Sequence, residues 1–253
     1  MIDTAILLAA GEGSRLRSAA PFKPLCRVAG RPLIAHALTG LAEAGLTRAV
    51  VVLGYGAAQI EAYLATQRWR MRLETVRVAD YRKPNGSSVL AAEPFVSEKG
   101  ALLAMCDHLV DPALYRRMAT AGAPAGGARL GIDRRLDSDW VDLDDVTRVE
   151  TAGERIVAIG KGMEPYDCYD TGVFAIGPKL IAALRQFDAP SLTEGMRLLA
   201  RDGDALVTDC SDIDWIDVDD AWALDKAEQW RAEQSQAERQ ELESAELEAQ
   251  RLS

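Results

Sequence analysis

The sequence predicts an α/β fold in which a mostly parallel central sheet carries helices on both faces. Continuous apolar runs at 6–10, 49–53 and 101–105 are typical of strands that are buried on both faces. Between them lie segments in which apolar residues recur with a period of about 3.6, as in helices that pack on one side. Alternation of such strands and helices is typical of parallel sheets.

The first half of the chain, residues 1–120, supplies the clearest elements. Strands are expected at 6–10, 49–53, 76–78 and 101–105, and helices at 32–44, at 57–64 and beginning at 88–92. Gly11 ends the first apolar run and Gly45 ends the first helical segment, because glycine readily leaves both kinds of element. This series of strands and helices predicts a Rossmann-like sheet.

The second half, residues 121–224, has a different sequence pattern. It opens with a joint rich in glycine and alanine at 121–127. The elements expected after it are short strands at 129–133, 147–150, 155–159 and 171–176, helices at 178–186 and 192–200, and a strand at 205–208. We interpret 121–177 as a β-rich insertion or half-domain that faces the first half across a cleft. Both halves belong to one expected domain, 1–224.

The tail, residues 225–253, is acidic and rich in alanine, glutamate and glutamine. It contains eight acidic and four basic residues and neither proline nor glycine, a composition that favours helix. Its large apolar residues keep no heptad, which argues against a coiled coil. We expect a partly solvated C-terminal helix that docks through its tryptophan end, with a partner-binding helix as the alternative.

Composition limits the class of function. The net charge of −10 argues against nucleic acid as the main partner, because nucleic-acid binding depends on cations that neutralise phosphates. A small phosphorylated ligand needs only a local cationic cleft. The apolar start at 2–10 is about half as long as a bilayer span and follows no basic leader, so neither a membrane span nor a secretory signal is expected. Four scattered cysteines without a CxxC pair predict a cytoplasmic protein without structural zinc.

The most informative segment is LAAGEGSRL, residues 8–16, at the end of the first predicted strand. Gly11 and Gly13 allow backbone N–H groups to approach an anion closely. Leu16 stands where both a P-loop and a dinucleotide-binding loop need a small residue, so neither motif fits. Taken alone, this glycine turn is better explained as an ordinary strand-to-loop turn with exposed basic residues.

Charged side chains follow this turn and the later strands. Arg15 and Lys23 suit a triphosphate, whose charge must be stabilised as pyrophosphate leaves. Asp107 directly follows the strand at 101–105, at the edge of the sheet where ligands bind, and a carboxylate there suits Mg²⁺. Capping of the next helix is the alternative role for Asp107.

A second acidic group lies in WIDVDD, residues 215–220. If this run is extended, Asp217 and Asp219 point to the same side and could face one cleft. Capping of the following helix is the alternative for Asp219 and Asp220.

Together these motifs resemble the sugar-phosphate nucleotidyltransferases with a MobA-like fold, which attach a nucleoside monophosphate to a phosphorylated small molecule. The resemblance covers roughly residues 3–224 and rests on the order LAAGEGSRL, FKPL, a strand ending in Asp107, and WIDVDD. Within this superfamily the chain is most similar to inositol-1-phosphate cytidylyltransferases, through NGSSVL (85–90), MCDHL (105–109), DDVTRV (144–149), IGK (159–161) and DTGVF (170–174). Ser87 departs from that branch, where a larger residue is expected. Those enzymes are often fused to a membrane synthase, and no such segment is expected here.

The resemblance implies a role for each matching residue. On the nucleotide it places Leu8, Ala9, Ala10 and Gly11 along the nucleoside, Glu12, Gly13, Ser14 and Arg15 around the triphosphate, Lys23 near the α-phosphate, and Asn85, Gly86, Ser87 and Ser88 at the base. Asp107, with Asp217 or Asp219, would hold Mg²⁺. The acceptor would meet Lys161, Asp170 and Thr171, with Arg134 and Arg135 nearby and Asp133 available for its hydroxyls. Arg15, Lys23 and Lys161 would be the catalytic cations.

The implied reaction is Mg²⁺-dependent transfer of CMP from CTP to a small phosphorylated acceptor resembling inositol 1-phosphate, with release of pyrophosphate. Its product would be an activated head group for lipid synthesis. Phosphocholine, a phosphoglycerate, or a sugar 1-phosphate with UTP or dTTP are alternative substrates. A nucleotide-sugar glycosyltransferase and a non-catalytic nucleotide-binding module are alternatives of other classes. A homo-oligomer is possible, but the sequence does not determine the oligomeric state.

Overall fold

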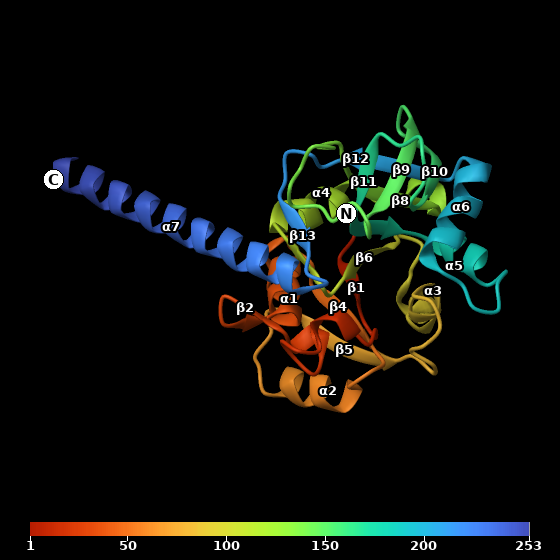
Figure 1. Ribbon diagram of the computed structural model, residues 1–253, viewed down its shortest axis with the longest axis horizontal. Helices are drawn as coiled ribbons and strands as arrows, with labels where there is room; N and C mark the ends of the chain where they lie inside the picture. The colour runs from red at the N-terminus through yellow and green to blue at the C-terminus, as the bar shows by residue number, and fades with distance from the viewer. Residues whose placement is uncertain (253) are drawn as a thin grey trace.

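The computed structural model describes the backbone of residues 1–252 and the side chains of residues 1–236 and 240. Its centre is a nine-stranded sheet in the order β5-β4-β1-β6-β11-β8-β12-β10-β9, with helices on both faces (Figure 1). The strands of this sheet are β1 (Thr4–Ala9), β4 (Arg48–Leu53), β5 (Arg72–Arg77), β6 (Ala101–Met105), β8 (Ala128–Asp133), β9 (Thr147–Ala152), β10 (Arg155–Lys161), β11 (Cys168–Ile176) and β12 (Ala205–Asp209). Two small sheets pair β2 (Arg27–Val28) with β3 (Arg31–Pro32) and β7 (His108–Val110) with β13 (Trp215–Asp217).

The described α-helices are α1 (Leu33–Glu43), α2 (Ala57–Ala65), α3 (Gly86–Ala91), α4 (Pro112–Ala121), α5 (Pro178–Leu184), α6 (Leu192–Asp202) and α7 (Ala221–Leu252). They alternate with strands in the first half of the chain, whereas β8 to β11 follow one another and α5 and α6 are consecutive. Short 3-10 turns at η1 (Ser14–Leu16) and η2 (Lys23–Leu25) carry the first basic side chains of the predicted site. None of the described helices is long and apolar enough to span a membrane.

The sheet is parallel where it carries the glycine turn and mixed elsewhere. β5, β4, β1 and β6 pair in parallel, whereas β11 runs antiparallel to both β6 and β8. The predicted α/β class with a central sheet is confirmed. The β-rich segment 121–177 adds its strands to this same sheet and forms no separate sheet of its own.

Apolar layers on both faces explain the unbroken apolar runs in the sequence. Along β1, Leu7 packs in the layer that α1, α2 and α4 cover, while Ile6 and Leu8 pack in the layer under α3, α5 and α6. Because successive side chains of a strand point to opposite faces, a strand covered on both sides must be apolar at each position. Each such side chain contributes about 1.5–3 kcal/mol when buried.

The edge strand β5 shows where this signal weakens. It spans 72–77 rather than the expected 76–78, and its side chains are half-buried or exposed. Edge strands commonly carry charged residues, and β5 carries Arg72, Glu74 and Arg77. The expected apolar pattern therefore marks only its end.

Helix α7 begins at Ala221, so the expected boundary between domain and tail falls inside its first turn. The Asp220 carboxylate accepts a hydrogen bond of 2.8 Å from the N–H of Ala223 and caps the helix. Trp230 is buried against the body of the protein, and the helix then runs away from the sheet (Figure 1).

Candidate active site

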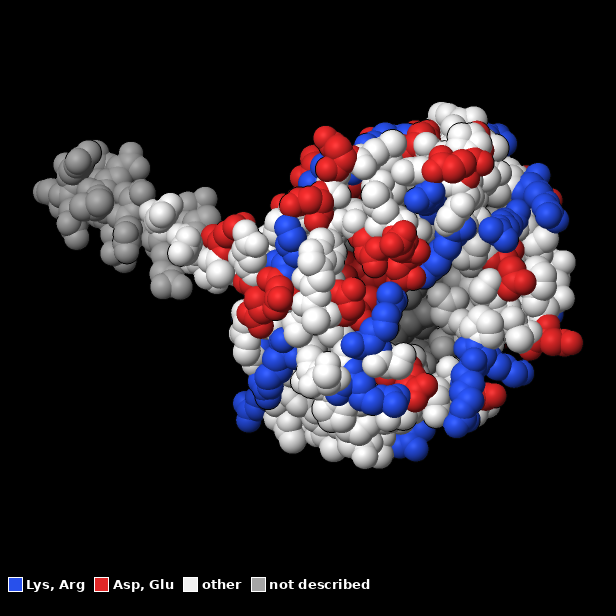
Figure 2. Space-filling view, viewed as in Figure 1, with Lys and Arg blue, Asp and Glu red and all other residues white. Residues whose placement is uncertain are grey.

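Two adjoining cavities open at the carboxyl ends of the central strands β1 and β6. The strands pair in parallel, with Leu8 opposite Met105, so the residues that follow them meet. The first cavity is lined by Leu8, Ala9, Gly11, Gly13, Ser14, Arg15, Lys23, Pro24, Cys106, Asp107 and Asp219. Asp107 and Asp219 also line the second cavity, so the two spaces meet at these carboxylates. A space-filling view shows a hollow bordered by basic and acidic side chains (Figure 2).

The glycine turn after β1 fits closely against Lys23. Gly13 has a φ of +59°, and a Cβ at this position would lie 2.4 Å from the Cβ of Lys23. Glycine is therefore required at residue 13 both by conformation and by space. Apart from Gly11 itself and its chain neighbours, no described atom lies within 4 Å of the position that a Cβ on Gly11 would take. The turn thus holds Lys23 on one side and leaves open space on the other.

Lys23 is the buried cation at the junction of the cavities. Its side chain is 8% exposed, and its Nζ lies 2.6 Å from Oδ2 of Asp107 and 3.9 Å from Oδ1 of Asp217. It also forms an ion pair with Asp219. Burial acts to raise the pKa of Asp107, but Lys23 and His108 outweigh it and the pKa is lowered. Three carboxylates therefore share one lysine.

Arg15 and Lys161 meet at Asp145, which reaches the site from the loop before β9. The Nη2 of Arg15 lies 2.6 Å from Oδ2 of Asp145, and Arg15 also pairs with Asp219. The Nζ of Lys161 lies 2.5 Å from Oδ1 of Asp145. Partial burial acts to raise the pKa of Asp145, but hydrogen bonds from Lys161 and Arg15 lower it. The three predicted catalytic cations thus converge through shared carboxylates.

His108 stands beside these acids, opposite Asp217 in the β7–β13 pair. Its Nε2 lies 3.4 Å from Oδ2 of Asp217, and its Nδ1 donates to the carbonyl of Thr171 at 2.9 Å. Its ring stacks on Trp215, and a Cβ on Gly172 would lie 2.3 Å from Nδ1. Burial acts to lower the pKa of His108, but Asp217 outweighs it and raises the pKa to about 9. The neighbouring carboxylates therefore favour the protonated form of His108.

The donor set suits a divalent cation. Asp107, His108 and Asp217 form one group of potential ligands, and Asp145, Asp217 and Asp219 form another. Oδ1 of Asp217 is buried without a hydrogen-bond partner. Clustered carboxylates, one with an oxygen that makes no hydrogen bond, match the preference of Mg²⁺ for hard oxygen ligands. His108 is the poorest fit, because its raised pKa favours the protonated ring, which cannot coordinate a metal.

The second cavity is lined mostly by residues 140–223, from the second half of the chain. Besides Asp107 and Asp219, its walls include Asn85, Met105, His108, Trp140, Val141, Asp142, Asp145, Val146, Thr147, Ile159, Lys161, Asp170, Gly172, Phe174, Leu192, Thr193, Met196, Trp215, Asp217, Asp220 and Ala223. Asp170 accepts a hydrogen bond of 2.7 Å from the N–H of Gly172, and burial raises its pKa to about 6. Acids, one lysine and apolar rings therefore surround this space, a mixture suited to a phosphorylated polyol.

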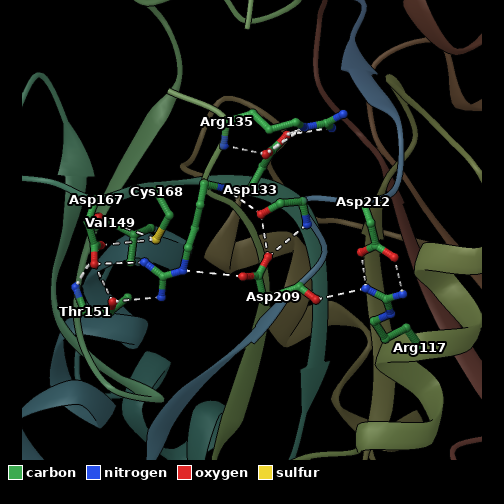
Figure 3. A network of polar contacts seen from close by, with 11 residues as sticks. Arg117, Asp133, Arg135, Val149, Thr151, Asp167, Cys168, Asp209 and Asp212 are labelled. Atoms are coloured by element: carbon green, nitrogen blue, oxygen red, sulfur yellow. Dashed lines mark hydrogen bonds and ion pairs between the residues drawn. The ribbon is translucent and has the colours of Figure 1, made fainter. Parts of the chain in front are cut away.

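Three residues predicted to bind the acceptor form ion pairs elsewhere. Asp133 is 1% exposed and receives a bidentate contact from Arg135, which bends back over it (Figure 3). Asp133 also accepts a hydrogen bond from Trp215. Arg134 pairs instead with Asp167 at 2.9 Å. None of the three lines either cavity, so their placement gives no support for contact with the acceptor.

Six further residues of the predicted site line neither cavity. These are Ala10, Glu12, Gly86, Ser87, Ser88 and Thr171. Glu12 pairs with Arg17, and Thr171 is fully buried, where its hydroxyl donates to the carbonyl of Gly131. Asn85 does line the second cavity, while its Oδ1 accepts from the N–H of Leu192. The proposed base-reading segment is thus anchored to α6.

The site predicted from the sequence did not include Asp145, His108 or Trp140. Asp145 lies in DDVTRV and His108 in MCDHL, two segments that carried the resemblance. An acid or imidazole inside a shared motif is a signal that could have identified both. Trp140 lies in an irregular loop, where no periodic pattern predicts which way a side chain points.

Residues 5–202 match the MobA-like NTP transferase domain. The chain belongs to this family. It is 33% identical over 220 residues to the Bifunctional IPC transferase and DIPP synthase of Rubrobacter xylanophilus, a match covering 85% of this chain and 49% of that protein. A protein of the same name from Aquifex aeolicus is 28% identical over 233 residues, covering 91% of this chain and 52% of that protein. The chain thus spans about half the length of these relatives.

Solved structures with a similar fold agree with this family assignment. The inositol-1-phosphate CTP transferase from T. maritima superposes with a TM-score of 0.78 and 26% identity, covering 88% of this chain and 91% of that one. A UDP-glucose pyrophosphorylase shares the fold, with a TM-score of 0.77 at 17% identity, covering 92% and 100%. The predictions of a nucleotidyltransferase, and of a resemblance to inositol-1-phosphate cytidylyltransferases within that superfamily, are confirmed.

Proposed function

We propose that the protein is a cytidylyltransferase that transfers CMP from CTP to inositol 1-phosphate or a closely similar phosphorylated polyol, with release of pyrophosphate. The observation that carries this proposal is the junction of the cavities, where Lys23 lies among Asp107, Asp217 and Asp219. A nucleotide in the first cavity would place its α-phosphate there, within reach of an acceptor in the second. The names of the relatives support the choice of substrates.

In the proposed reaction, a phosphate oxygen of the acceptor attacks the α-phosphorus of CTP, and the bond between that phosphorus and the bridging oxygen to the β-phosphate breaks. The electron pair leaves with pyrophosphate. No proton needs to move, because the attacking phosphate is already an anion at neutral pH. The protein's task is therefore to align two polyanions and to stabilise charge on the leaving group.

The cationic side chains divide this task. Lys23 lies where the α-phosphate would pass between the cavities, and Arg15 lies in the first cavity beside the glycine turn. Lys161 lines only the second cavity, where it would hold the acceptor phosphate. Asp107, Asp217 and Asp219 would hold Mg²⁺, which neutralises phosphate charge when bound. The resemblance assigns the base to residues 85–88, but the cavities lend this role no support, because Asn85 lines only the second cavity and residues 86–88 line neither. The cytoplasm is the proposed setting.

The test is pyrophosphate release by the purified protein with CTP, UTP or dTTP and a panel of acceptors, with the product identified by mass spectrometry. The panel comprises inositol 1-phosphate, phosphocholine, 3-phosphoglycerate and glucose 1-phosphate. We expect release only when CTP, Mg²⁺ and inositol 1-phosphate are all present. Turnover of UTP or dTTP with glucose 1-phosphate would instead identify a sugar-nucleotide enzyme. Absence of release with every pair would contradict the proposal.

A further inference from the structure

We propose that the first turns of α7 belong to the acceptor site, because they hold Trp140 and the loop around it, residues 137–146, against the second cavity. This inference deepens the proposed function and rests on it, since it takes the second cavity as the acceptor site. It also gives a role to part of the acidic tail, which lies beyond the matched family domain at 5–202.

Direct contacts join α7 to this loop. The Trp140 ring, which lines the second cavity, lies edge-on to Trp230, with ring centres 6.4 Å apart. The Nζ of Lys226 lies 5.6 Å from the centre of the Trp140 ring and 2.9 Å from Oδ2 of Asp139. An aromatic pair and a cation over a ring both favour one ring orientation. Two residues of α7 thus contact the Trp140 ring directly.

The helix is itself anchored on the scaffold that carries the catalytic groups. Ala223, Ala227 and Trp230 lie three or four residues apart, hence on one face of α7, and all three are buried. They pack in one cluster with Cys26 and Val28, which follow Lys23, and with Leu109, Ile216 and Val218, which adjoin Asp107 and Asp217. The backbone N–H of Ala29 also donates to Glu228 at 2.9 Å. The position of α7 is therefore set relative to the metal-binding acids.

The opposite end of the loop is held from the nucleotide side. Asp145 pairs with Arg15 and Lys161, as described above. The loop is consequently fastened at two places, one through Asp145 and one through α7. Loss of the α7 contacts should free Trp140 while Arg15 and Asp145 stay paired. Binding of the acceptor should then weaken more than binding of CTP.

Four variants separate this positioning role from general stability. Trp230→Ala removes the ring contact, and Trp230→Phe keeps an aromatic ring if the alanine variant folds poorly. Lys226→Met keeps most of the side-chain stem but removes its charge. Gln229→Ala is the matched control, because Gln229 is exposed on the same helix and the described contact of its side chain is a hydrogen bond of 3.0 Å to Glu233.

Hydrogen–deuterium exchange and steady-state kinetics give two readouts. We expect faster exchange at 137–146 in Trp230→Ala and Lys226→Met, and wild-type exchange in Gln229→Ala. The KM for the acceptor should rise about tenfold in Trp230→Ala and about threefold in Lys226→Met, with kcat and the KM for CTP within about twofold of wild type. Trp230→Phe should recover most of the loss.

Unchanged exchange at 137–146 in both Trp230→Ala and Lys226→Met would overturn the inference. So would a fall in kcat with the KM for the acceptor unchanged, which a merely structural role would produce. If the wild-type protein transfers CMP to no acceptor, the proposed function fails, while the exchange measurement still decides whether α7 holds the loop.

Discussion

The Nζ of Lys23 lies 2.6 Å from Oδ2 of Asp107, a residue 84 positions further along the chain. Burial of a charged pair costs free energy that its own attraction rarely repays, so such a pair is a weak source of stability. Here the pair stands where the two cavities meet, and two further carboxylates surround the same lysine. The arrangement is better explained by a ligand that brings a cation and phosphates.

Replacement of Lys23 should therefore affect turnover more than CTP binding. We expect Lys23→Met to lower kcat about 10²–10³-fold, because the lysine would stabilise charge that grows in the transition state, while the KM for CTP changes by less than about tenfold. Lys179→Met is the control, since Lys179 pairs with Asp204 at 2.8 Å and lines neither cavity. Steady-state pyrophosphate release measures both variants. Wild-type kcat in Lys23→Met would show that the lysine has no part in the chemical step.

Loss of a carboxylate at the junction should weaken metal binding. We expect Asp217→Asn to raise the Mg²⁺ concentration needed for half-maximal activity about tenfold or more, because Asp217 belongs to both groups of potential ligands and its Oδ1 makes no hydrogen bond. Asp212→Asn is the control, because Asp212 is an exposed acid that pairs with Arg117. Mg²⁺ titrations of activity, and of intrinsic fluorescence without substrates, provide the comparison. Equal Mg²⁺ requirements in the two variants would place the metal elsewhere.

The parts of the fold that sequence predicts well are those that burial dictates. The runs in β1, β4 and β6 are apolar at nearly every position because helices cover both faces of these strands, so they stand out in the sequence. The edge strand β5 carries charges and was located only in part. The joining of β8 and β11 to the same sheet depends on long-range pairing, which no local pattern specifies.

The same distinction holds in the candidate site. The proximity of Lys23 and Asp107 could be predicted from the sequence, because the carboxyl ends of parallel strands lie at the same end of a sheet. Asp133 and Arg135 lie two residues apart and looked like free groups for an acceptor, yet they neutralise each other. Charge type in a sequence does not reveal which partner is nearest, so pairing within a motif was overlooked.

The buried carboxyl of Asp170 should make stability depend on pH. Burial raises its pKa to about 6 in the folded protein, against 3.8 for an ordinary aspartate. Between these values the folded state binds more protons than the unfolded state, so the free energy of unfolding falls as pH rises from 4 through 6. Asp170→Asn removes this dependence. The free energy of unfolding of the wild type, relative to that of the variant, should therefore fall by about 2 kcal/mol between pH 4 and pH 6. Urea unfolding at pH 4, 5, 6 and 7 gives the measurement, and a constant difference would contradict it.

The final prediction separates backbone strain from steric displacement of Lys23. Gly13 and Gly153 have nearly equal positive φ angles, +59° and +62°, so alanine at either position costs about 1–2 kcal/mol of conformational energy. A Cβ at Gly13 would lie 2.4 Å from the Cβ of Lys23, whereas none of the described atoms lies within 4 Å of the corresponding position on Gly153. Both variants should lose similar stability in urea unfolding, apart from any cost of moving Lys23. Only Gly13→Ala should also lower kcat, by about tenfold or more, because the displaced lysine no longer meets the α-phosphate. Equal kcat values in the two folded variants would mean that the glycine turn does not position Lys23 for the reaction.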